Sequence, residues 1–149
     1  MAGENKENVD VDTEAEMEEF AMHFEANRLD SFKDWPFQED CSCVPQKLAE
    51  AGFYHIPSEQ EPDAVRCFMC QKELDGWEPD DDPMSEHRKH APKCYFLKHW
   101  KPEEEYTVAD FVKSISERQQ AKMKRLLETK TKEFQKQAAE VRKQMELLK

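Results

Sequence analysis

Apolar residues recur at helical spacing over the last third of the chain. They follow one another at three- and four-residue steps, or multiples of these, from Val108 to Leu148. Thr107-Val-Ala-Asp110 has the form of a capping box, and no Pro or Gly follows it. The pattern therefore predicts one amphipathic helix over residues 108–149, about 60 Å long at about 1.5 Å per residue.

An apolar stripe of this length is typical of one strand of a coiled coil or helical bundle. We expect its apolar edge to contact partner helices through Phe111, Ile115, Met123, Leu126, Phe134, Val141, Met145 and Leu148. The alternatives are an isolated solvated helix, or a homodimer in which residues 106–115 pack on a second copy with Phe20 or Trp100.

The preceding residues show shorter periods. The apolar positions within 17–29 suggest a short amphipathic helix, and residues 45–50 a second one with Pro at its first turn. Residues 53–56, 64–68 and 71–74 are interpreted as three short strands separated by polar turns. Three closely spaced aromatic residues are predicted to belong to the core, namely Phe32, Trp35 and Phe37.

Composition suggests one small domain with appendages. Of 149 residues 37% are charged and only 38% hydrophobic, which leaves little material for a second core. We divide the chain into an acidic disordered tail (1–16), a zinc domain (17–99), a linker (100–107) and the long helix (108–149).

The net charge of −11 is unevenly distributed. Residues 108–149 hold 11 Lys and Arg against 6 Asp and Glu, whereas the rest of the chain holds 11 against 27. Halves of opposite charge favour different partners. The sequence contains no stretch that resembles a secretory signal or a membrane span, so we expect neither secretion nor a membrane partner.

Five cysteines are present, an odd number. Cys41 and Cys43 are separated by one residue, a poor geometry for pairing, which fits a reduced cytosolic or nuclear protein. In the tail, Lys6-Glu7-Asn8 resembles the KEN degron used in the cell cycle, although a three-residue match also arises by chance.

The other three cysteines and one histidine form the array C-x2-C-x16-H-x6-C: Cys67, Cys70, His87 and Cys94. Three thiolates and an imidazole at these spacings suit one tetrahedral Zn²⁺. We expect a tight turn to carry the first pair, and a helix opened by Pro83 to carry the other two ligands two turns apart. Four protein ligands leave no open position for water, so the site is predicted to be structural and the protein not to be an enzyme.

The chain resembles the baculoviral inhibitor-of-apoptosis repeat (BIR) family over about residues 20–97. The residues that carry this resemblance are Arg28, Phe32, Trp35-Pro36, Ala51-Gly52-Phe53, Cys67-Phe68-x-Cys70, Gly76-Trp77-x-Pro79-x-Asp81-x-Pro83, Glu86-His87, Cys94 and Phe96. The resemblance implies an α+β fold: a small zinc-binding BIR domain, with a three-stranded antiparallel sheet and short helices, followed by one long C-terminal α-helix.

Family members with a single repeat and one long helix imply more. They suggest a non-enzymatic adaptor of the chromosomal passenger complex whose helix joins borealin-like and inner-centromere-protein-like helices, with an Aurora-type kinase as an indirect partner. Such an adaptor serves chromosome segregation and cytokinesis. The implied locations are nucleus and cytoplasm, and in mitosis the centromere, spindle midzone and midbody.

Seven carboxylates between residues 73 and 86 crowd beside Trp77. Their mutual repulsion favours a cationic ligand, and a free α-amine beside an indole wall matches the amino-terminal-capture mode of peptide recognition. From the resemblance, the expected ligand is a histone-3 tail with a phosphorylated threonine at its third position. The predicted peptide-binding residues are Lys72, Leu74, Asp75, Trp77, Asp80, Asp81 and His90.

The sequence leaves three alternatives open. The carboxylates could instead only cap and solvate, with Asp82 capping the helix after Pro83. A direct inhibitor of apoptosis would bind Ala-starting antagonist tails or caspase-pathway proteins. A nucleic-acid zinc finger would be basic around the metal, although the cations of the long helix could contact DNA, nucleosomes or microtubules.

Overall fold

The computed structural model describes residues 13–149, so the predicted Lys6–Asn8 degron lies outside the described part. The chain forms two compact units, one ending at Pro92 and the other spanning Lys93–Lys149. Within residues 13–149, no helix is both long enough and apolar enough to cross a membrane.

The first unit begins with two helices where the sequence suggested one. Helix α1 spans Thr13–Ala21 and α2 spans Glu25–Asp30. Arg28 explains the break, because its Nη1 donates to the carbonyls of Met22 and His23, both at 3.0 Å. These carbonyls lie between the two helices and bond to a side chain instead of continuing a helix. Residues 13–16, predicted as part of the acidic tail, are helical because α1 starts at Thr13, and the rest of that predicted tail lies outside the described residues.

Arg28 also ties α2 to the rest of the unit. Its Nε donates to the carbonyl of Ala49 at 2.9 Å, and its guanidinium lies 4.6 Å from the centre of the Phe68 ring. The side chain is buried, so these contacts replace the water that a cation otherwise requires.

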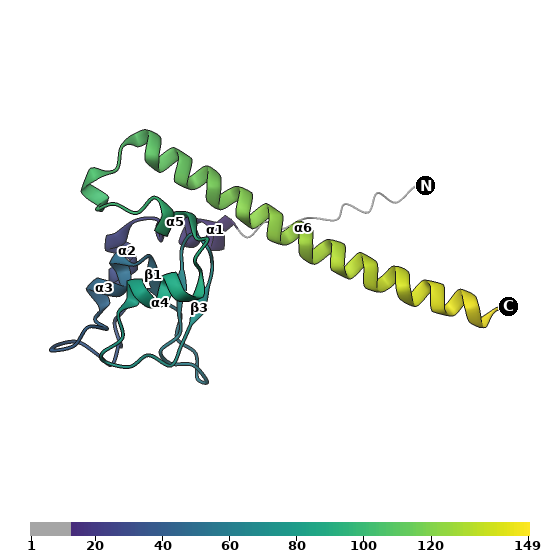
Figure 1. The fold of residues 1–149 in the computed structure, drawn as a ribbon, viewed down its shortest axis with the longest axis horizontal. Coiled ribbons are helices and arrows are strands. Elements are labelled where there is room, and N and C mark those ends of the chain that lie inside the picture. The colour runs from purple at the N-terminus through teal and green to yellow at the C-terminus, as the bar shows by residue number, and fades with distance from the viewer. Residues whose placement is uncertain (1–12) are drawn as a thin grey trace. The chain divides into compact units, whose positions relative to one another are not determined.

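The sheet has three antiparallel strands in the order β1-β2-β3 (Figure 1). Helix α3, Pro45–Glu50, precedes β1 at Phe53–His55, and β2 covers Val65–Cys67. Strand β3 is reduced to Glu73–Leu74 and lies at an edge of the sheet. These elements confirm the predicted order, with strands one to two residues shorter than expected.

Aromatic side chains fill much of the core beside the sheet. Phe32 and Trp35 are buried as predicted, whereas Phe37 is only half-buried against the Trp35 ring. Phe32 stacks on His55 of β1 with ring centres 5.5 Å apart. The indole nitrogen of Trp35 donates to the Cys43 carbonyl at 2.9 Å, so this buried polar group is satisfied.

The second unit contains α5, Tyr95–Lys98, a 3₁₀ turn η1, Glu103–Glu105, and the long helix α6, Val108–Leu147. The turn lies in the segment predicted as a linker. The capping box at the start of α6 is present as predicted, with Thr107 and Asp110 bonded to each other through side chain and backbone.

Lys101 strengthens this cap. Its ammonium donates to Asp110 Oδ2 at 2.6 Å. This bond, together with those from the Thr107 backbone and hydroxyl, holds the pKa of the Asp110 carboxyl well below its ordinary value. The helix therefore begins at a carboxylate that stays ionised in acid.

Candidate metal centre and adjoining acidic loop

The first two metal-ligand candidates lie on the turn that follows β2. Cys67 ends the strand, and the backbone amides of Met69 and Gln71 point back at it, to Sγ at 3.3 Å and to the carbonyl at 3.1 Å. Gln71 has a φ of 62°, an unusual value for a side-chain-bearing residue that closes this tight turn. The tight turn predicted for the first pair of ligands is therefore confirmed, and Cys70 lies within it.

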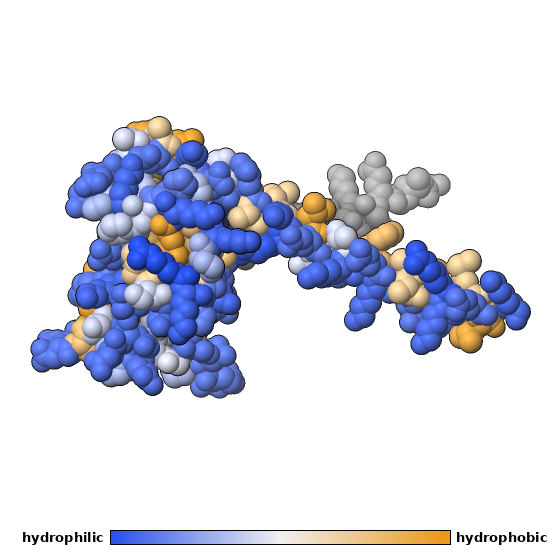
Figure 2. All heavy atoms as spheres, viewed as in Figure 1, coloured by the Kyte–Doolittle hydropathy of each residue, from blue (hydrophilic) through white to orange (hydrophobic). Residues whose placement is uncertain are grey.

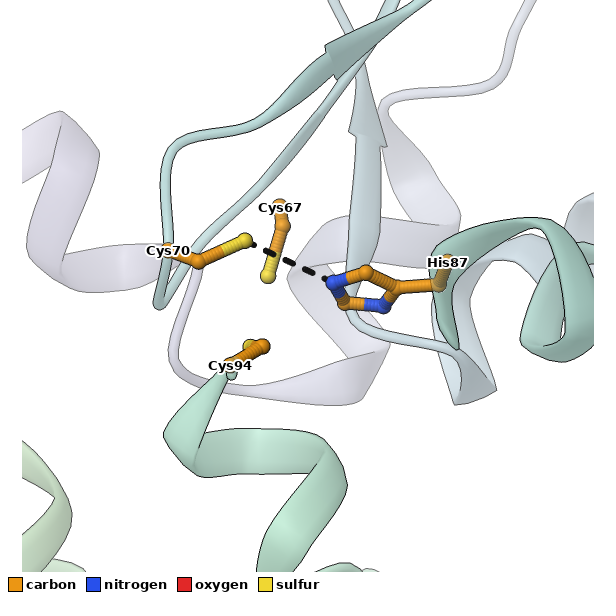
Figure 3. A group of neighbouring side chains, drawn as sticks. All are labelled: Cys67, Cys70, His87 and Cys94. Carbon is orange, nitrogen blue, oxygen red and sulfur yellow. Dashed lines mark hydrogen bonds between the residues drawn. The ribbon is translucent and has the colours of Figure 1, made fainter. Parts of the chain in front are cut away.

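His87 reaches the same point from helix α4, Pro83–His90 (Figure 3). Its Nδ1 lies 2.8 Å from the carbonyl of Ala51, an acceptor only, so Nδ1 carries the proton and Nε2 keeps its lone pair. Nε2 lies 3.5 Å from Cys70 Sγ. A backbone carbonyl thus fixes the ring orientation and tautomer that a metal ligand needs.

Cys94 does not share a helix with His87, which corrects the predicted arrangement. Helix α4 ends at His90, and Cys94 precedes the first residue of α5. The intervening Ala91, at the end of α4, has φ −139° and ψ 63°, which is not helical. The third thiol therefore comes from a separate turn.

The four side chains form one group whose ligand atoms all lie within 4.8 Å of one another. Cys67, His87 and Cys94 are buried, and Cys70 is half-buried. Three sulfurs and one unprotonated imidazole nitrogen are the donor set of a structural zinc site, and together they fill a tetrahedron. The residues are thus arranged to hold one structural Zn²⁺ per chain.

An acidic loop, residues 75–82, connects β3 to α4. Asp63 accepts the backbone N–H of Trp77 at 2.8 Å, and the backbone amides of Ser42 and Cys43 both donate to the carbonyl of Pro79 at 3.0 Å. Within the loop, Asp81 Oδ2 accepts the backbone N–H of Glu78 at 2.8 Å. The loop is held at several points, so its carboxylates are presented from a fixed backbone.

The thiol of Cys43 belongs to a residue that is hydrogen-bonded to this loop through its backbone amide. Burial, then the charge of Asp81 and the neighbouring Cys41 and Asp63, raise the pKa of Cys43 to about 12. The Cys43 thiol is therefore neutral and unreactive at physiological pH.

The Trp77 side chain packs in the core, but its indole nitrogen lacks a hydrogen-bond partner among the described residues. The side chain is 7% exposed and packs edge-on against Phe53, with ring centres 5.8 Å apart. Its indole nitrogen is buried and has no hydrogen-bond partner among the described residues. An unsatisfied buried donor costs about 1–3 kcal/mol.

The aspartates of the loop differ in role. Asp82 stands at the N-cap position of α4 as expected, but its carboxylate accepts from the Ser85 hydroxyl at 2.6 Å instead of from a backbone amide. Asp81 is half-buried, whereas Asp75 and Asp80 are exposed. Asp82 therefore makes no capping bond to a backbone amide of α4, and the expected capping does not account for the loop carboxylates.

Lys72 and His90, two of the predicted peptide-binding residues, lie in different surroundings. Lys72 is exposed at the start of β3, and no ion pair involves it among residues 13–149. His90 Nε2 lies 3.3 Å from the carboxylate of Glu86, which is also 3.5 Å from the ammonium of Lys89. Leu74, another of the predicted peptide-binding residues, is half-buried.

Most of the predicted partner-helix residues are exposed on α6. Met123, Leu126, Phe134, Val141 and Met145 are between 52% and 70% exposed, and Leu148 lies just beyond the helix. Figure 2 shows apolar side chains at intervals among hydrophilic ones along α6. Phe111 and Ile115, near its start, are half-buried.

Several residues that shape the site gave no sequence signal. The Ala51 carbonyl orients His87, Asp63 holds the Trp77 backbone, and Arg66 pairs with Glu73 beside the predicted peptide site. Ala51 and Asp63 act across 36 and 14 residues of chain. No local motif marks a contact made by a backbone group or by a side chain from a distant loop.

Comparison with known proteins confirms the resemblance. A family model described as the Inhibitor of Apoptosis domain (BIR) matches residues 28–98. The chain is 50% identical over 127 residues to Baculoviral IAP repeat-containing protein 5 of Rattus norvegicus, covering 85% of this chain and 89% of the relative. Identity to the protein of the same name from Mus musculus is 48% over 127 residues, covering 85% and 91%.

A further relative is Baculoviral IAP repeat-containing protein 5.2 of Xenopus tropicalis, 47% identical over 131 residues, which are 88% of this chain and 84% of the relative. These relatives are of the survivin type. Each aligned stretch is longer than the matched repeat, so the similarity extends to residues outside it.

Proposed function

The chain belongs to the inhibitor-of-apoptosis domain (BIR) family, and from this membership and the site geometry we propose that it is a non-enzymatic adaptor of the chromosomal passenger complex. In this proposal the repeat captures the amino terminus of a histone-3 tail phosphorylated at its third residue. Helix α6 joins the partner helices, and the complex is thereby brought to centromeres in mitosis.

The free edge of β3 is the observation that carries the peptide-binding proposal. Cys67 N–H donates to the carbonyl of Lys72 at 3.0 Å, so this carbonyl faces β2. Peptide groups alternate in direction along an antiparallel strand, and those of Glu73 therefore face away from β2, toward the open edge. An extended peptide can add there as a fourth strand, with main-chain hydrogen bonds supplying affinity.

The acidic loop supplies the charge for the α-amine. One oxygen of Asp81 accepts the Glu78 amide, and its other oxygen has no bond among the described residues. Asp75 adds a second exposed carboxylate next to β3. A charge-assisted bond from an ammonium to such a carboxylate is about twice as strong as a neutral one.

Leu74 and Trp77 form the wall against which a small first side chain packs. Lys72 lies two residues before Leu74, on the same face of the strand, and so meets the third residue of an antiparallel peptide. His90, on α4 next to Glu86, is the second residue that we propose contacts the phosphate.

Helix α6 supplies the assembly function in the proposal. Its apolar residues repeat at helical spacing and stay exposed, which fits a seam completed by borealin-like and inner-centromere-protein-like helices. An Aurora-type kinase is then an indirect partner, held by the same complex.

Titration with four synthetic peptides tests the proposal. The peptides begin Ala-Arg-Thr, with the amino terminus free or acetylated and the threonine phosphorylated or not. Acetylation should weaken binding by roughly 30-fold or more, since one partner of a partly buried charge pair is lost at a cost of about 2–5 kcal/mol. Lys72→Gln should weaken only the phosphorylated peptides.

The peptide's own Arg serves as an internal control, because it keeps its charge on acetylation. Equal binding of free and acetylated peptides would leave only nonspecific attraction between acids and a basic tail. The amine-capture proposal would then be wrong.

A second candidate function follows from the family description itself. Proteins of this family carry a domain named for inhibition of apoptosis, and an amine-capturing site also fits an antagonist tail that starts with Ala. An Ala-starting peptide without phosphothreonine distinguishes the two. If it binds more tightly than the phosphorylated histone-3 peptide, the apoptosis-inhibitor role is favoured.

A further inference from the structure

A row of three side chains crosses the sheet on the face opposite to Phe53 and Val65, with Tyr54 buried at one end. Tyr54 of β1 lies opposite Arg66 of β2, which lies opposite Glu73 of β3. Arg66 Nε donates to Glu73 Oε1 at 2.9 Å, and its Nη2 donates to the same oxygen. Tyr54 is the partner of Arg66 across the β1–β2 ladder. The pair is partly open to solvent, with side-chain exposures of 31% for Arg66 and 52% for Glu73.

This row lies on the face opposite to Leu74. Leu74 is paired with Val65, which is buried in the core, so Leu74 and Trp77 serve the core face. Successive side chains of a strand point to opposite faces. Glu73 therefore stands between Lys72 and Leu74 in sequence but on the other side of the sheet.

The proposed peptide register places its second residue over this row. If the first residue contacts Leu74 and the third meets Lys72, an antiparallel added strand sets the second residue directly opposite Glu73. Directly opposite side chains are about 4.5–5.5 Å apart at their Cβ atoms and interact. The second side chain thus meets a carboxylate whose charge Arg66 already offsets.

We propose that Arg66 is a specificity-determining residue for the second position of the bound peptide: by pairing with Glu73 it reduces the preference of the site for a basic side chain there. The inference rests on the proposed amine-capturing function. It concerns a residue that touches neither the α-amine nor the phosphate, so the two can be tested apart.

Peptides with a free amino terminus, a phosphothreonine at position three, and Arg or citrulline at position two provide the probe. Citrulline keeps the shape of Arg and lacks its charge. The native chain should bind the two peptides within about two-fold of each other. In Arg66→Gln, the Arg peptide should be preferred by up to about five-fold, the range of an exposed charge pair. Adding Glu73→Gln to that variant should abolish the gain.

Measuring the Arg-to-citrulline binding ratio in Glu73→Gln alone provides a second test that does not depend on the Arg66 variant. It leaves the Arg66 charge without its partner, so the citrulline peptide should become the preferred one by a few-fold. Arg142→Gln removes one positive charge from α6 and is the matched control, with no change expected in the ratio.

The inference is overturned if Arg66→Gln leaves the Arg-to-citrulline ratio at its native value, or if Arg142→Gln raises it equally. Amine-dependent binding with an unchanged ratio would remove the inference alone and leave amine capture standing. Equal binding of acetylated peptides would remove the proposed function, and this inference with it.

Discussion

The repeat buries many of its apolar side chains, whereas helix α6 leaves most of its own exposed. Leu48, Phe53 and Val65 of the repeat have no exposed surface, whereas Phe134 of α6 is 70% exposed. The repeat adds buried polar anchors and four metal ligands to its small core. The comparison indicates that the repeat is completed by a metal ion, and in our proposal α6 is completed by other chains.

Metal removal should have the largest effect of all, and it should act on the stability of the repeat. Cys67→Ser or treatment with a strong chelator should abolish the cooperative thermal transition of the repeat, since the apparent free energy of binding at structural zinc sites is about 10–16 kcal/mol. Differential scanning calorimetry together with metal analysis checks the result.

Cys41→Ser is the matched control, because Cys41 stands outside the donor set. It should keep one zinc per chain and a native transition. A Cys67→Ser variant that retained both properties would contradict the metal assignment.

Loss of the Arg28 anchor should come next in size. Arg28→Met leaves the carbonyls of Met22, His23 and Ala49 without their donor, and we expect a loss of roughly 3 kcal/mol in the free energy of unfolding. Denaturant unfolding of the zinc-loaded protein measures it. Arg88→Met, an exposed position on α4, should change stability by less than about 0.5 kcal/mol. Equal effects of the two substitutions would mean that the anchor is not needed.

The cap of α6 should show the smallest effect, visible in acid. The pKa of Asp110 is depressed below its ordinary value of 3.8, so its contribution to stability is present above that value and is lost as pH falls through the lower folded pKa. Asp110→Asn should remove this pH dependence. An NMR titration of the Asp110 carboxyl and the Thr107 amide reports it, and Lys101→Met should raise the measured pKa. A native midpoint at the ordinary value would contradict the cap.

Local patterns predicted the features that depend on neighbouring residues. The spacing of Cys67, Cys70, His87 and Cys94 gave the ligand set, because a metal site constrains residue types strongly. The capping box at Thr107 was also predictable, since its partner lies three residues away.

Features that depend on tertiary contacts were missed or wrong. The split between α1 and α2 follows from Arg28 bonding to the intervening carbonyls, which spacing of apolar residues does not encode. The separation of Cys94 from α4 was missed because the step from His87 to Cys94 matches two helical turns, although the helix already ends at His90. The Arg66–Glu73 pair required the strand register, which only the fold supplies.

A crossed binding experiment tests the division of labour most directly. Two variants, Asp81→Asn and Leu126→Glu, are each titrated with the phosphorylated histone-3 peptide and with the joined borealin-like and inner-centromere-protein-like helices. Asn keeps an oxygen for the Glu78 amide while removing the charge, and Glu at position 126 brings a charge into a desolvated seam. The account predicts that Asp81→Asn loses only the peptide and Leu126→Glu loses only the helices. A variant that lost both ligands in equal measure would contradict the account, and so would a variant that lost neither ligand. In either case the repeat and α6 would not be separate binding modules of one adaptor.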